Sequence, residues 1–165
     1  MNDLHDVFDY KFELLKHEMD ALQSGIRSYD SNLFTIKGWA ITIFSAFVIF
    51  SLQANQPLYL AFCVVPITLF WLVDAIFKTI QRIYTRRYSK IEQFLQSNEF
   101  ADAVAKRSFG SFTVNDTGTG FHMKMRDVYW PSIIHSATML PTSLLYSVML
   151  LMTIGLAILL SVKGP

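Results

Sequence analysis

The chain has 165 residues, of which 52% are hydrophobic and 16% are charged, with one cysteine, a net charge of +1 and a mean hydropathy of +0.34. Its 27 charged residues (14 basic plus 13 acidic) leave two long gaps, because residues 38–77 hold only Asp74 and residues 128–162 hold none. This composition excludes an ordinary soluble domain, a nucleic-acid-binding surface and a disulfide framework, and it predicts an integral membrane protein.

Residues 1–30 are predicted to form a cytoplasmic amphipathic helix. Apolar residues with helical spacing form a seam along it: Phe8, Phe12, Leu15, Met19, Leu22 and Ile26. The seam lasts less than three heptads, so two interpretations stay open: contact with other copies of the chain, or packing on the chain's own connector. The polar face carries charges of both signs, which does not fit a helix lying on anionic lipid: Asp9, Lys11, Glu13, Lys16, Glu18 and Asp20.

Three stretches are long and apolar enough to cross a bilayer as helices. They cover about residues 38–54, 57–77 and 142–162. Asp30 or Ser31 is the expected N-cap of the first span, and the polar turn 55–57 joins it to the second. Pro66 is the expected bend in the second span. The predicted fold class is therefore an all-α membrane protein with three transmembrane helices.

The second span contains no helix-breaking residue after Pro66 until about Ser97, so its helix is expected to extend into the cytoplasm. Residues 31–97 then form a transmembrane hairpin with a helical extension. Lys78, Arg82 and Arg86 lie at i, i+4 and i+8 and share a face of that helix. They form either a basic collar at lipid headgroups, or a ring of positive charge around a pore mouth or a site for a phosphate-bearing ligand. The second interpretation requires an oligomer.

Residues 98–130 are interpreted as a cytoplasmic connector, and residues 131–165 as an interfacial lead-in followed by the third span, with Pro141 between these two parts. In the connector, residues 112–114 and 121–123 are expected to pair as a small hairpin. The Gly-Thr-Gly stretch at 118–120 lacks the ending of a phosphate-binding P-loop.

The basic residues indicate the orientation of the spans. Thirteen of the fourteen Lys and Arg residues lie before the first span or between the second and the third. The positive-inside rule then places the N-terminus and the connector in the cytoplasm and the C-terminus in the periplasm of a bacterial inner membrane.

Asp74 is the acid inside a span, where a charged carboxylate is costly. One interpretation pairs it with Lys78 at i, i+4 on the same helix. The alternative places it toward a bundle interior, paired with another helix or subunit, or lining a water-filled path. The histidines are scattered and no nucleophile, base and acid set is discernible. We therefore expect no enzyme, no metal site and no cofactor.

Two motifs carry a resemblance over residues 28–95. Lys37-Gly38-Trp39 opens the first span, and Phe70-Trp71-Leu72-Val73-Asp74-Ala75 closes the second, followed by Arg82 and Arg86. In these motifs the chain resembles a widespread group of small bacterial multi-span membrane proteins of the kind found among anti-phage membrane effectors. The resemblance implies a homo-oligomer that a soluble cytoplasmic sensor triggers to permeabilise the inner membrane. The alternative function is a non-conducting anchor or scaffold for a soluble cytoplasmic partner.

Overall fold

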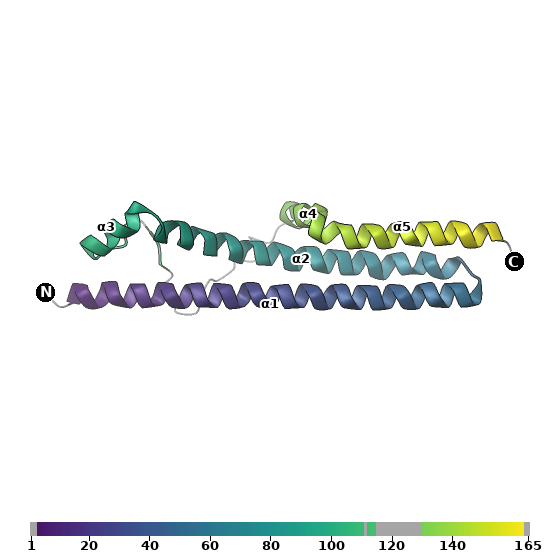
Figure 1. Cartoon of the computed structure of the whole chain (residues 1–165), viewed down its shortest axis with the longest axis horizontal. Coiled ribbons are helices and arrows are strands. Elements are labelled where there is room, and N and C mark those ends of the chain that lie inside the picture. Colours follow the sequence, from purple (N-terminus) through teal and green to yellow (C-terminus); the bar gives the residue numbers. More distant parts are fainter. Residues whose placement is uncertain (1–2, 111, 115–129, 164–165) are drawn as a thin grey trace. The chain divides into compact units, whose positions relative to one another are not determined.

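The computed structural model describes residues 3–110, 112–114 and 130–163, and this part of the chain is helical with no strand. The helices are α1 (Asp3–Ala54), α2 (Leu58–Leu95), α3 (Asn98–Lys106), α4 (Trp130–Thr138) and α5 (Leu140–Lys163) (Figure 1). The all-helical prediction is therefore confirmed for the described residues. Of the predicted hairpin, residues 112–114 have no regular secondary structure, and residues 121–123 lie outside the described part.

The helix α1 is continuous over 52 residues. The expected N-cap at Asp30 or Ser31 is therefore wrong, since both residues lie inside the helix. No proline interrupts residues 3–54, and one helix can satisfy its backbone hydrogen bonds throughout without a new cap.

The polar turn between the first two spans is confirmed. α1 ends at Ala54 and α2 begins at Leu58. Asn55 adopts a left-handed backbone conformation with φ of 48°, which asparagine tolerates better than most residues. The Ser51 hydroxyl donates a hydrogen bond of 2.8 Å to the Gln56 carbonyl and closes the turn.

The extension of the second span is also confirmed, because α2 continues through Pro66 to Leu95. The lead-in to the third span forms a separate helix, α4. α5 begins at Leu140, so Pro141 lies in its first turn, where its missing N–H has no helical partner to lose. Pro141 therefore does not separate the two helices; Met139, between Thr138 and Leu140, does so.

Three helices, α1, α2 and α5, are long and apolar enough to cross a membrane. Only 22%, 28% and 22% of their most apolar stretches are buried within the chain. Soluble monomers rarely expose contiguous apolar patches of this extent. The exposed faces of these helices therefore fit association with a membrane.

The described chain divides into two compact units, and each is described by itself. Unit 1 consists of Met1–Ser28 and Gln81–Asp127. Its core includes seam residues of α1 packed against Ile91 and Phe94 of α2, Ala103 of α3, and Phe109 and Val114 after it. The Phe94 and Phe112 rings stack with centroids 3.9 Å apart. This unit therefore has a hydrophobic core of its own.

Unit 2 consists of Tyr29–Ile80 and Val128–Pro165 and contains the predicted spans. α5 runs alongside α2 (Figure 1), and the rings of Trp71 and Tyr146 stack with centroids 6.1 Å apart. Buried residues of all three long helices form its core: Ala40, Phe44, Cys63, Ile67, Tyr146 and Met149. The core thus holds the three spans together on one side and leaves their other faces exposed.

Candidate functional site

The candidate site is a pocket in unit 2 that we call the Asp74 pocket. It has a volume of about 180 Å³ and is lined by two acids and two lysines, which are Asp30, Lys37, Asp74 and Lys78. Leu33, Phe34, Pro141 and Thr142 complete its wall. These residues come from where the predicted first span begins, the second ends and the third begins. The helices therefore converge there at one predicted level of the bilayer.

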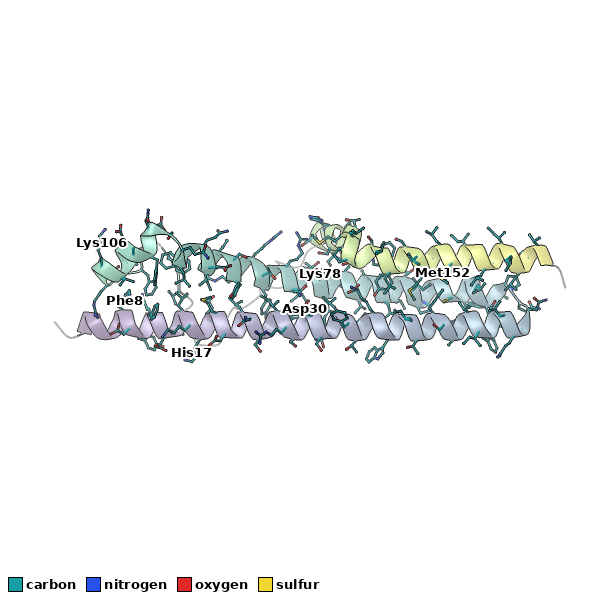
Figure 2. The ribbon with its side chains drawn as sticks, in the orientation of Figure 1. Phe8, His17, Asp30, Lys78, Lys106 and Met152 are labelled. Carbon is teal, nitrogen blue, oxygen red and sulfur yellow. The ribbon has the colours of Figure 1, made fainter. Side chains whose placement is uncertain are left out.

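Asp30 of α1 and Lys78 of α2, both labelled in Figure 2, line the pocket. The four charged side chains sum to a formal charge of zero. A neutral total lets the charged groups be partly buried at lower cost than an excess of either sign would.

The Asp74 carboxylate is the most buried charged group of the pocket, with 1% of its side chain exposed. Its Oδ2 atom lies 3.7 Å from Nζ of Lys37, which belongs to α1. The lysine donates a hydrogen bond of 3.1 Å to the carbonyl of Pro141 in α5. Lys37 thus connects to two other helices, through an ion pair and through a hydrogen bond.

Neither oxygen of Asp74 accepts a hydrogen bond within the described part of the chain. The separation from Lys37 exceeds hydrogen-bond length, so the lysine compensates the charge without filling the lone pairs. The Tyr146 hydroxyl is near enough to interact electrostatically with Asp74, but it is also buried without a hydrogen-bond partner among these residues. The wall of the pocket therefore contains a buried carboxylate whose lone pairs no hydrogen bond of the described residues fills.

Two further polar contacts fix α2 against α4 close to the pocket. The Trp71 indole N–H donates to the Ala137 carbonyl at 3.1 Å. The Thr79 hydroxyl lies 2.9 Å from the Ser136 hydroxyl, and both side chains are buried. These contacts hold the middle part of α2, which carries Asp74, against α4.

The predicted basic residues Lys78, Arg82 and Arg86 all lie on α2, but they differ in burial and in what they contact. Lys78 is half-buried and lines the Asp74 pocket. Arg82 is half-buried and interacts within the chain, whereas Arg86 is exposed. Asp74 forms an ion pair with Lys37, a partner that the spacing argument did not name. Lys37 belongs to the Lys-Gly-Trp motif and Asp74 to the Phe-Trp-x-x-Asp-Ala motif, so each motif contributes one residue of the ion pair.

The six seam residues lie in unit 1 and pack within the chain. Phe8, Leu15 and Leu22 are buried in its core, and Phe12 and Met19 pack against that core. Ile26 is half-buried. The seam therefore packs on the chain's own segments, and contact with other copies of the chain stays a prediction.

One buried ion pair of unit 1 was missed by the sequence interpretation. Glu18 was assigned to the polar face, but only 2% of its side chain is exposed. The Arg87 guanidinium donates to both of its carboxylate oxygens, at 2.7 and 3.0 Å, and also to the Thr113 carbonyl at 2.9 Å. This pair joins α1, α2 and the segment 112–114. Glu18 lies three residues after Leu15 and four before Leu22, a spacing that places it on the seam side.

Among the described residues, no group of three His, Cys, Asp or Glu side chains is arranged to hold a metal ion. No protein-family model, curated protein or solved structure matches this chain.

Proposed function

We propose that this protein is an oligomeric effector of the bacterial inner membrane, of the kind used in anti-phage defence, that permeabilises the membrane when triggered from the cytoplasm. In this proposal unit 1 and the N-terminus are cytoplasmic, and the C-terminus is periplasmic. The partners are the lipid bilayer, further copies of the chain and a soluble cytoplasmic sensor.

The observation that supports the proposal is the junction at Asp74. One buried ion pair and one lysine hydrogen bond link α1, α2 and α5 where the predicted spans meet the membrane surface. Such a junction holds the three helices in one arrangement. We propose that this arrangement is the closed one, and that breaking the pair lets the spans of neighbouring copies open a path for ions.

Membrane potential in living cells tests this function. Cells that express the wild-type chain are challenged with a panel of phages while a potential-sensitive dye is recorded. We expect wild type to depolarise after infection. Asp74→Asn breaks the pair proposed to hold the closed arrangement, so it should depolarise cells already before infection. Asp102→Asn, which changes an exposed acid of unit 1, should respond like wild type. Unchanged potential in every infection, together with no ion flux from reconstituted liposomes, would exclude permeabilisation.

The proposed orientation has its own test. After Cys63→Ser removes the native thiol, His17→Cys and Gln56→Cys place single thiols at exposed positions in unit 1 and in the α1–α2 turn. A membrane-impermeant thiol reagent should label position 56 in spheroplasts. It should label position 17 only after the inner membrane is opened. The reverse pattern would contradict the orientation.

A non-conducting anchor is the second candidate function, and unit 1 is the observation that favours it. This unit has its own core and its own buried ion pair, so it is a structured surface on which a soluble partner can dock. The anchor function predicts a stoichiometric complex with that partner and no ion flux in liposomes. Ion flux that depends on Asp74 would favour the effector instead.

A further inference from the structure

A second hollow adjoins the Asp74 pocket in unit 2. It is an apolar groove of about 540 Å³ between α1 and α5, which we call the Gly38 groove. Gly38 and Ile41 form one side of it, and Leu144, Leu145 and Val148 form the other. Phe34, Lys37 and Pro141 line both the groove and the Asp74 pocket. A charged pocket and an apolar groove therefore share one wall.

Gly38 contributes to the shape of this groove. A Cβ atom built on Gly38 meets no other atom within 4 Å. The missing side chain therefore leaves space in the groove that Gly38 lines. The groove runs from the predicted edge of the bilayer along the two spans, which is the direction of a lipid acyl chain.

The Asp74 pocket has complementary chemistry for a headgroup with both charges. Neither oxygen of its buried carboxylate accepts a hydrogen bond within the described chain, although Lys37 and the Tyr146 hydroxyl lie beside it. An ammonium group provides three donors together with a positive charge. Lys37 lies where the pocket meets the groove, and a lysine there suits a phosphate. The pocket total of zero charge disfavours a purely anionic headgroup.

We propose that the Asp74 pocket and the Gly38 groove together bind one phospholipid whose zwitterionic headgroup carries a primary ammonium, as in phosphatidylethanolamine. The ammonium lies at Asp74, the phosphate beside Lys37, and one acyl chain in the groove. The inference rests on the bilayer placement in the proposed function but does not depend on permeabilisation. It predicts discrimination against phosphatidylcholine, because a trimethylammonium group has no N–H to donate.

Native mass spectrometry of the purified full-length protein in detergent tests the site. The protein is delipidated and titrated with phosphatidylethanolamine, phosphatidylcholine and phosphatidylglycerol of identical acyl chains, and with glycerophosphoethanolamine, which has the headgroup alone. We expect phosphatidylethanolamine to bind about tenfold more tightly than the other two lipids, from hydrogen bonds to a charged carboxylate. The headgroup alone should bind more weakly than the full lipid.

Two variants with matched controls separate the headgroup from the acyl chain. Asp74→Asn should lower the affinity for phosphatidylethanolamine about tenfold, whereas the exposed Asp102→Asn should not. Gly38→Leu fills the groove and should weaken binding several-fold, because the acyl chain loses van der Waals contacts with α1 and α5. Gly155→Leu is its control, because a Cβ at Gly155 also meets no atom within 4 Å and Gly155 does not line the groove.

Each alternative result overturns the proposal in a recognisable way. Equal affinity for the three lipids would remove the headgroup assignment. Equal affinity of Gly38→Leu and Gly155→Leu for phosphatidylethanolamine would show that the acyl chain does not lie in the groove. This comparison can be made even if Asp74→Asn fails to fold. Full binding of glycerophosphoethanolamine would indicate a site for a free amine or phosphate. None of these measurements requires ion flux, so failure of the lipid site and failure of the effector function are distinguishable.

Discussion

Arg87→Met is the substitution with the largest effect expected in unit 1. It removes two hydrogen bonds to Glu18 and one to the Thr113 carbonyl, at distances of 2.7, 3.0 and 2.9 Å. Only 17% of the Arg87 side chain and 2% of the Glu18 side chain are exposed. Removing one partner of a buried ion pair costs about 3–5 kcal/mol, since the other charge stays buried. A loss of about 3 kcal/mol raises the local opening equilibrium roughly 100-fold.

Hydrogen exchange of the full-length protein in detergent measures this opening. We expect faster exchange in residues 7–28 and 81–95 of Arg87→Met and no change in α5, which belongs to unit 2. Lys106→Met is the control, because its exposed i,i+4 pair with Asp102 is worth at most about 0.5 kcal/mol.

The double variant Glu18→Leu with Arg87→Met removes both charges and should recover most of the lost protection. Wild-type exchange in Arg87→Met, or an equal rise in α5, would refute the assignment of this pair to the stability of unit 1.

Three more predictions concern single contacts. Lys37→Met leaves Asp74 buried without its ion-pair partner and should lower the free energy of unfolding of unit 2 by about 3 kcal/mol, measured as thermal stability in detergent. The double variant Lys37→Met with Asp74→Leu should regain wild-type stability within about 1 kcal/mol, and a loss equal to that of the single variant would contradict this. Gly25→Val should destabilise unit 1 by about 1–3 kcal/mol, since a Cβ there lies 2.9 Å from the Tyr84 ring. Gly155→Val, which meets no neighbour, is the control, and equal exchange in both variants would argue against the Tyr84 contact.

The charge gaps of the sequence predict the three membrane helices because charge cannot enter hydrocarbon cheaply. The α1–α2 turn and the extension of α2 follow from the position of the breaking residues. The internal cap at residue 30 was wrong because a capping residue is compatible with a helix start but does not require one. The local sequence pattern is therefore sufficient to predict where helices occur, but it predicts their ends much less well.

Contacts between helices were the part that the sequence could not supply. Spacing rules compare residues within one helix, so they offered Lys78 as the partner of Asp74. They left a partner on another helix open as an alternative, but they could not identify it as Lys37. The same limit applies to Glu18, whose partner Arg87 is far along the chain. In both buried pairs the sequence shows which residues are charged. Which acid pairs with which base depends on how the helices pack, and the sequence does not show that.

The location of the Asp74 pair across two helices has a consequence for register. A slip of α1 along α2 by one helical turn, about 5.4 Å, would separate charges that now lie 3.7 Å apart and leave a buried carboxylate uncompensated. A pair along α2 alone would permit such a slip. The interhelical pair therefore selects one register of the spans, and a ligand that donates to Asp74 in that register stabilises it further. Lipid binding and helix register are in this way coupled through one carboxylate.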